Sequence, residues 1–246
     1  LIRRHKAASA AIAIALVALL AGLGISLWQR DQAIAARNLA LAEEERSDTI
    51  RESLYFLLAE TGAADGQGTS ALGLAAAADR IGARFDAAPT QYAAVLQALG
   101  ELQFYLSDDV GALATLGRLL DRSDAIDPEP LAQARYNAAQ AHMRQGRAED
   151  AGRLLAQAQQ FWNSDRGRWA MRLTDSRLLE AQVLRQRDPA AAVALLEQTL
   201  DRHIRQQGTD NQRAGVFYNN IGTSLVTLNR LQKAQAALDK AHAVWR

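Results

Sequence analysis

The sequence repeats itself with a period of about 40 residues, a length typical of proteins built from stacked structural repeats, and this feature constrains the fold more than any other. The anchors are four alanines, spaced 39, 41 and 42 positions apart: Ala112, Ala151, Ala192 and Ala234. Four positions after each anchor lies a leucine: Leu116, Leu155, Leu196 and Leu238. Twelve positions before the anchors lie Gly100, Ala139, Glu180 and Gly222, and seven positions after them lie Leu119, Ala158, Thr199 and Ala241.

These offsets predict that each unit is a pair of antiparallel helices joined by a short turn. Good helix formers dominate the units, whereas Val and Ile are sparse beyond the N-terminal segment 1–30, so a sheet is not expected. A small residue on the first helix would let the second helix approach, and the leucine after the anchor would fill the space between them. Gly146 and Asn229, each five positions before an anchor, suit the turn because they favour left-handed backbone. One pair cannot bury its apolar face alone, so we expect the pairs to stack into an all-α solenoid.

Two of the four units closely resemble the tetratricopeptide repeat (TPR) family. They are ARYNAAQAHMRQGRAEDAGRLLAQA (134–158) and FYNNIGTSLVTLNRLQKAQAALDKA (217–241). The unit around residues 99–120 is a fair match, and the unit around residues 178–200 is degenerate, because Glu180 and Thr199 replace small residues. The resemblance covers roughly residues 90–246 and implies a TPR-like α-solenoid.

We extend this domain to residues 71–246, with an Ala-rich helix at 71–86 as its N-terminal cap. The preceding segment GAADGQGTS (62–70) is predicted to be a loop because of its glycine content. Residues 30–61 are predicted to be a helical stalk, since neither glycine nor proline occurs between Gly24 and Gly62.

Residues 7–29 form an uncharged stretch of 23 positions, preceded by Arg3, Arg4 and Lys6. A helix of that length reaches roughly 35 Å at ~1.5 Å per residue, enough for a hydrocarbon core about 30 Å thick. We therefore predict a membrane span within an N-terminal segment, residues 1–29. A cleaved signal peptide is the alternative, although the apolar run is long and no convincing cleavage motif comes after it.

The basic cluster predicts that the N-terminus is cytoplasmic. We therefore expect a single-pass protein of a bacterial inner membrane with its repeat domain in the periplasm. Within the span, Ala18, Gly22 and Ser26 form a stripe of small residues at four-residue intervals. Such a stripe lets two membrane helices approach closely, so a homodimer through it is one interpretation, and chance in an Ala-rich helix is the other.

The order of the segments resembles the C-terminal half of proteobacterial transmembrane serine/threonine kinases. The shared features are a basic start, a span ending in LWQR, a charged stalk, a short apolar helix such as ESLYFLLAE, and TPR-like repeats. The resemblance implies a sensor or interaction module for signal transduction, with the kinase domain preceding the span. The alternative is a membrane-tethered scaffold or adaptor of an envelope complex that has no kinase partner.

The residues give no sign of catalysis in this chain. No Gly-rich nucleotide loop, His-Arg-Asp loop or Asp-Phe-Gly occurs. The four histidines, His5, His142, His203 and His242, lack metal-ligand spacing, and cysteine is absent. Asp108 and Asp109 are expected to cap a helix rather than to act as a catalytic pair. We predict a chain that is not an enzyme and that holds no metal or cofactor.

The net charge of +1 gives no reason to expect nucleic acid as a partner. We instead expect a protein or peptide ligand on the concave surface lined by the first helices of the pairs. The resemblance implies that Asn137 and Asn220 contact the backbone of an extended peptide, because asparagine stands at this motif position in peptide-binding members. Four residues would flank them: Tyr136, Gln140, Asn219 and Thr223. Asparagine is also common there whatever the ligand, so both interpretations stay open.

An aromatic cluster is the last feature of note. Phe161, Trp162 and Trp169 stand between the second and third units. We expect them to pack between these units rather than to form a platform for a ligand, because aromatic side chains stabilise an irregular junction.

Overall fold

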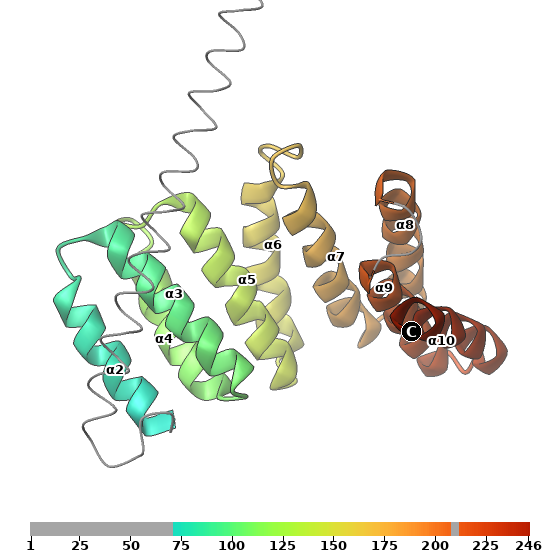
Figure 1. The fold of residues 1–246 in the computed structure, drawn as a ribbon, viewed down its shortest axis with the longest axis horizontal. Coiled ribbons are helices and arrows are strands. Elements are labelled where there is room, and N and C mark those ends of the chain that lie inside the picture. The colour runs from blue at the N-terminus through green and yellow to red at the C-terminus, as the bar shows by residue number, and fades with distance from the viewer. Residues whose placement is uncertain (1–70, 208–211) are drawn as a thin grey trace, which may run out of the picture. The chain divides into compact units, whose positions relative to one another are not determined.

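The computed structural model describes residues 71–207 and 212–246, and every regular element within them is an α-helix (Figure 1). α2 (Ala71–Arg84) precedes four helix pairs. The pairs are α3 (Pro89–Tyr105) with α4 (Asp109–Asp121), α5 (Pro128–Arg144) with α6 (Ala148–Trp162), α7 (Ala170–Arg185) with α8 (Pro189–Gln207), and α9 (Gln212–Thr227) with α10 (Leu231–Trp245). The prediction of an all-α repeat of paired antiparallel helices is therefore confirmed.

The predicted segments at residues 7–29, 30–61 and 62–70 lie outside the described residues. None of the described helices combines the length and the apolar character that a bilayer crossing requires. All of these helices belong to one compact unit, Ser53–Arg246.

The turns within the pairs use a left-handed residue at a fixed position of the repeat. Gly146 has a φ of 74° and Asn229 a φ of 55°, as predicted, and Ser107 occupies the equivalent position with a φ of 64°. In each case the next amide reaches back to a carbonyl five residues earlier, for example from Arg147 to His142 at 2.9 Å. This bond satisfies a carbonyl that the end of the helix leaves without a partner. The third pair differs, because the amide of Asp188 bonds to Leu184, only four residues back.

Side chains at the predicted offsets join the two helices of a pair. The four anchoring alanines are at most 2% exposed. Gly100 on α3 lies so close to α4 that an added Cβ would stand 2.7 Å from Cγ of Leu116, and Gly222 is equally close to Leu238. Asp108 caps α4 as expected, since its carboxylate accepts a 2.9 Å hydrogen bond from the amide of Gly111.

The pairs stack in sequence order (Figure 1). Each second helix contacts the first helix of the next pair, and the first helices α3, α5, α7 and α9 contact one another in turn. α2 contacts both α3 and α4, which fits its expected role as the N-terminal cap, although the helix ends at Arg84 rather than at residue 86.

The hydrophobic core of the stack is divided at α7. One cluster of buried side chains runs from Leu74 on α2 to Leu179 on α7. A second cluster runs from Ala181 on α7 to Ala237 on α10. The division falls in the degenerate third unit, where Glu180 stands at the position that glycine or alanine occupies in the other units. A carboxylate there cannot contribute to a continuous apolar seam.

Neighbouring units are also linked by ion pairs that all run in the same direction along the chain. Six arginines in the described residues bond to an acid 35–39 residues earlier in the chain. They are Arg118 with Asp79, Arg122 with Asp86, Arg144 with Asp109, Arg168 with Glu129, Arg187 with Glu149, and Arg213 with Asp175. In all six the arginine belongs to the later unit. Most are solvent-exposed, and an exposed ion pair contributes little to stability.

Candidate functional site

The six predicted contact residues form two groups on two first helices. Tyr136, Asn137 and Gln140 lie on α5, and Asn219, Asn220 and Thr223 lie on α9. α7 contacts both helices, and no contact joins α5 to α9 in the described residues. A ligand that touches both groups therefore has to cross α7.

Asn137 is largely buried and is bonded on both sides of its amide. Its Nδ2 donates to Oε1 of Glu101 on α3 at 2.7 Å, and its Oδ1 accepts from Nε2 of Gln133 at 2.9 Å. Glu101 also accepts from Gln97 at 3.4 Å. The carboxylate of Glu101 therefore joins α3 to α5 through a row of amides that the sequence did not reveal. An asparagine amide retains one further N–H and one further lone pair after these two bonds.

Tyr136 packs against the second helix of its pair. Its ring meets the ring of Trp162 edge to face, with centroids 5.6 Å apart. Burial raises the pKa of the Tyr136 phenol to about 12, and the nearby carboxylate of Asp175 adds to the effect. The hydroxyl therefore remains protonated, and able to donate a hydrogen bond, at any physiological pH.

The α9 group is more accessible. Asn220 is half-buried, and its Nδ2 donates to the carbonyl of Val216 at 2.9 Å while Nε2 of Gln182 on α7 stands 3.5 Å from its Oδ1. Thr223 is exposed and donates to the carbonyl of Asn219 at 2.8 Å. Asn219 and Gln140 are half-buried. These side chains present amide and hydroxyl groups of the kind that pair with an extended backbone.

An ion pair ties α7 to α9 beside this group. Arg213 and Asp175 are bonded, and about two thirds of each side chain is buried. Burial nevertheless raises the pKa of Asp175 above its ordinary value, and Arg213, which lowers it, offsets only part of that effect. Removing both charges from water is costly, so this pair links α7 to α9 without being expected to add much stability.

The aromatic residues at the second junction pack as expected. Trp162 is 1% exposed and forms a small core with Ala132 and Ala158. The rings of Phe161 and Trp169 lie 5.7 Å apart and pack against this core.

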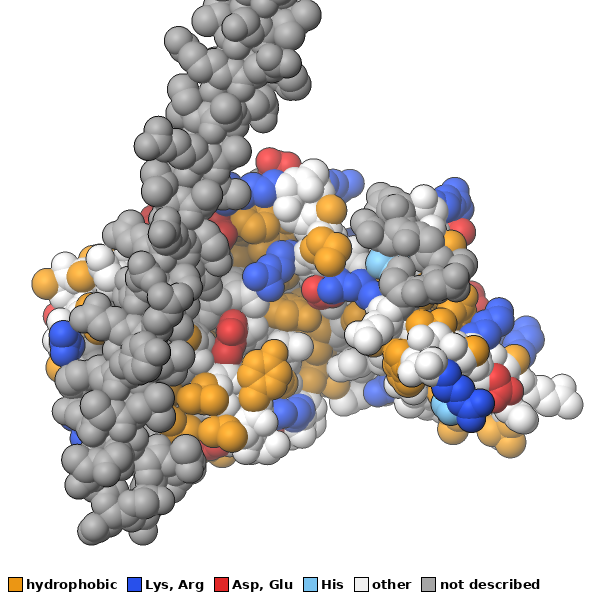
Figure 2. Space-filling model, viewed as in Figure 1, with side chains coloured by type: hydrophobic (Ala, Val, Ile, Leu, Met, Phe, Trp, Pro, Cys, Tyr) orange, Lys and Arg blue, Asp and Glu red, His pale blue; other side chains and the backbone are white. Residues whose placement is uncertain are grey.

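The described residues contain no group of three or more histidine or carboxylate side chains arranged to hold a metal ion. The surface seen in Figure 2 mixes apolar side chains with charges of both signs. Its chemistry is that of hydrogen bonding and apolar contact, which suits the binding of a polypeptide.

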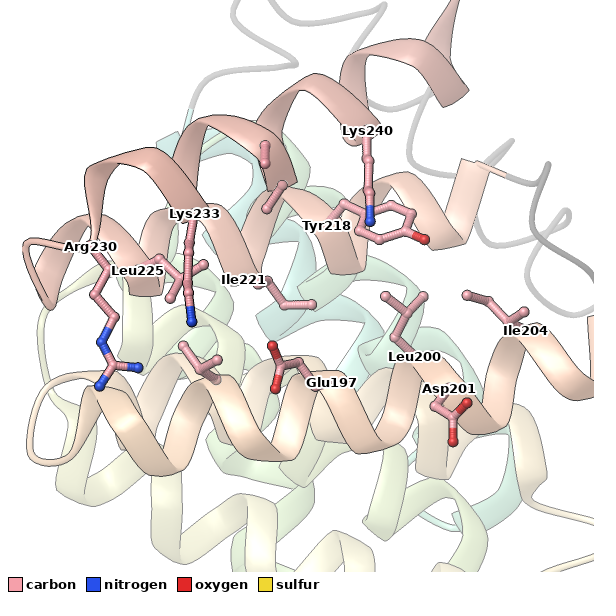
Figure 3. Close-up of a pocket in the computed structure, with 13 residues that line it drawn as sticks. Glu197, Leu200, Asp201, Ile204, Tyr218, Ile221, Leu225, Arg230, Lys233 and Lys240 are labelled. Carbon is pink, nitrogen blue, oxygen red and sulfur yellow. The ribbon is translucent and has the colours of Figure 1, made fainter.

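A hollow lies between α8 and α10. It has a volume of about 520 Å³ and is lined by side chains from α8, α9 and α10 and by Arg230 (Figure 3). No sequence pattern indicated it, because α8 and α10 are separated in the chain by a whole helix.

Comparison with solved structures identifies the fold. Two crystal structures of the Podosopora anserina putative kinesin light chain with nearly identical TPR-like repeats, one of them a single-substitution variant, superpose with TM-scores of 0.60 and 0.61. Both are 14% identical to this chain, and the matches cover 80–81% of it and 93–94% of theirs. BtubC (BKLC) from P. vanneervenii superposes with a TM-score of 0.57 at 20% identity, over 72% of this chain and 74% of its own.

At these identities the likeness shows a TPR-like repeat fold and nothing finer. No protein-family model matches the sequence, and no curated protein matches it.

Proposed function

We propose that this chain is a protein-interaction or sensor module that binds an extended peptide of a partner protein along its first helices. The observation that carries the proposal is the recurrence of an amide side chain at one position of the repeat. Asn137 and Asn220 stand on α5 and α9 at equivalent places, each two residues before a buried small residue, Ala139 or Gly222. TPR-like repeats generally bind protein partners, which supports the same conclusion.

The two asparagines differ in how they would bind. Asn220 is half-buried and its neighbour Thr223 is exposed, so this end can meet a ligand directly. Asn137 is 7% exposed and bonded to Glu101, so a ligand there would use the remaining N–H or lone pair of the amide. We expect the α9 group to contribute more to binding than the α5 group.

We further propose that the module is the non-catalytic C-terminal region of a bacterial transmembrane serine/threonine kinase, anchored in the inner membrane through residues 7–29. The order of basic start, apolar stretch, charged stalk and repeats supports this proposal. Ligand binding in the periplasm would alter the association of the span and so signal to the kinase domains. The alternative is a membrane-tethered scaffold with no kinase partner. Sequencing upstream of Leu1 distinguishes the two proposals, because only the first requires a kinase domain there.

Peptide binding is tested by selecting ligands from a random peptide library against the full chain in neutral lipid nanodiscs. The peptide selected on the wild-type chain then serves as the probe in titrations. We expect Asn220→Ala to weaken its binding about tenfold or more, the effect of losing hydrogen bonds to a backbone. Asn163→Ala is the matched control, because Asn163 is exposed, is not one of the proposed contact residues, and likewise donates from Nδ2 to the carbonyl four residues earlier. Equal affinity of the two variants would remove the proposed site.

A further inference from the structure

The hollow between α8 and α10 has walls of opposite charge (Figure 3). The α10 side carries Arg230, Lys233 and Lys240, and the α8 side carries Glu197 and Asp201. Its floor is apolar and includes Leu200, Ile221 and Leu225, each at most 6% exposed. Lysine occurs only three times in the chain, and two of the three line this groove.

The positive wall is not neutralised by the rest of the described chain. Asp201 is bonded to Arg205, so its charge is already compensated. By contrast, no carboxylate of the described residues lies within ion-pair distance of Arg230, Lys233 or Lys240. Lys240 instead stands 5.5 Å from the centre of the Tyr218 ring. Among the described residues, the three cations therefore face Glu197 alone as an uncompensated acid, which gives the groove a net positive charge.

The groove lacks the ion pair that the pattern between neighbouring units would lead one to expect. Elsewhere an arginine reaches an acid 35–39 residues earlier and draws neighbouring units together. Glu197 and Lys233 are 36 positions apart and point into the same space from opposite walls, yet they are not paired (Figure 3). Both charges therefore remain available to a ligand.

The lining also limits the backbone conformation of that ligand. None of the lining side chains is Asn, Gln, Ser or Thr, so apart from one tyrosine the polar partners in the groove are charged side chains. The backbone of an extended strand would compete for them with the carboxylates of an acidic ligand. A helix satisfies its own backbone and presents only side chains. Arg230 and Lys240 are ten residues apart, which corresponds to roughly 15 Å along α10 and to about three turns of a bound helix.

We propose that this groove is a second binding site, which accepts an acidic amphipathic helix from a partner protein. Its carboxylates would face Lys233, Lys240 and Arg230, and its aliphatic side chains would contact Ile221 and the neighbouring floor. A flat anionic membrane fits less well, because Glu197 and Asp201 form one wall and the apolar side chains are recessed. The site lies between second helices and is independent of the peptide surface proposed for the first helices.

The probe is a synthetic helix of about four turns with leucine along one face and glutamate along both edges. Its binding to the full chain in phosphatidylcholine nanodiscs is measured by fluorescence anisotropy, with empty nanodiscs subtracted. We expect saturable binding that Lys233→Glu weakens at least about tenfold, because the substitution places a like charge opposite the probe. Ala236→Glu, which adds a carboxylate to the groove from an exposed position of α10, should also weaken binding.

Arg202→Glu is the matched control, since it makes the same change of charge on an exposed residue of α8 outside the groove. We expect this variant to bind the probe as the wild-type chain does. Equal weakening by Arg202→Glu and Lys233→Glu would show a long-range charge effect and overturn the proposal. The proposal would also be overturned if a version of the probe with lysine along both edges bound equally tightly. Binding of phosphatidylglycerol vesicles that depends on Lys233, without binding of the probe, would assign the groove to a membrane surface instead.

Discussion

At the scale of single residues, closeness between helices depends on the absence of one methyl group. Gly100 faces Leu116, which is fully buried and has no room to retreat, because an added Cβ would stand 2.7 Å from its Cγ. Gly117, the neighbour of that leucine on α4, has no atom within 4 Å of the same added group. Replacing each of the two glycines by alanine therefore separates the effect of packing on stability from the effect of backbone entropy.

We predict that Gly100→Ala lowers the free energy of unfolding by about 1–3 kcal/mol, as overpacking of a core does. Gly117→Ala should instead raise it by about 0.5–1 kcal/mol, because alanine favours the helix and nothing obstructs it. Urea unfolding followed by circular dichroism measures both. Stabilisation by Gly100→Ala would show that α3 and α4 are not in close contact.

The residues that the sequence predicted well are those whose role depends only on size and spacing. The anchoring alanines and Gly100 are small because a helix crosses there, and that requirement repeats with the period of the chain. Ser107 was missed, because serine has no marked preference for left-handed backbone although Gly146 and Asn229 do. The bond from Asn137 to Glu101 was also missed, since nothing in the sequence says which of several polar side chains on α3 faces α5.

At the scale of the helix, one position of the repeat can be buried or open depending on whether another helix covers it. Trp162 and Trp245 stand eleven residues after their anchors, near the ends of α6 and α10. Trp162 is 1% exposed, because α7 and its preceding loop cover it. Trp245 is 49% exposed and packs mainly against Gly215 of its own pair.

Removing these two indoles should therefore have unequal effects. We predict that Trp162→Ala lowers the free energy of unfolding by about 3–5 kcal/mol, the range for a fully buried aromatic side chain. Trp245→Ala should lower it by about 1–2 kcal/mol, because only part of the ring leaves contact with protein. Thermal and urea unfolding of both variants give the comparison. Equal losses would contradict the view that α7 closes the second unit.

The helices themselves were predictable because proline, glycine and the apolar pattern mark their ends. The groove between α8 and α10 was not, since it depends on the distance between helices that are not neighbours in the chain. That distance is set by how α9 packs between them, which no local pattern records.

At the scale of the whole described stack, stability is expected to be a sum of unit and neighbour terms. The two larger clusters of the core meet on α7, so a substitution that destabilises one of them should have only a weak effect on the other. The division falls in the degenerate third unit, where Glu180 stands at a position for small residues and bonds to Gln159 and Arg177.

We predict that Leu196→Ala, in the second cluster, accelerates amide hydrogen exchange in α8, α9 and α10 while leaving α3 and α4 unchanged. Leu196 is 1% exposed, so its truncation should destabilise that cluster by about 2–5 kcal/mol. Leu116→Ala is the reciprocal control and should accelerate exchange in α3 and α4 instead. Uniform acceleration in either variant would mean that the stack unfolds as one cooperative body.

The six ion pairs between units have a consequence for how such a chain can lengthen. Each unit brings arginine to the one before it and offers acid to the one after it. The partners stand at different positions of the repeat at successive junctions: Arg144 lies seven residues before its anchor, Arg187 five residues before its own, and Arg213 twenty-one. A tandem copy of one unit would therefore not present the acid that its own arginine requires at the new junction. The charges thus favour one order of the units, and a copied unit would leave unmatched arginines where it joins the original.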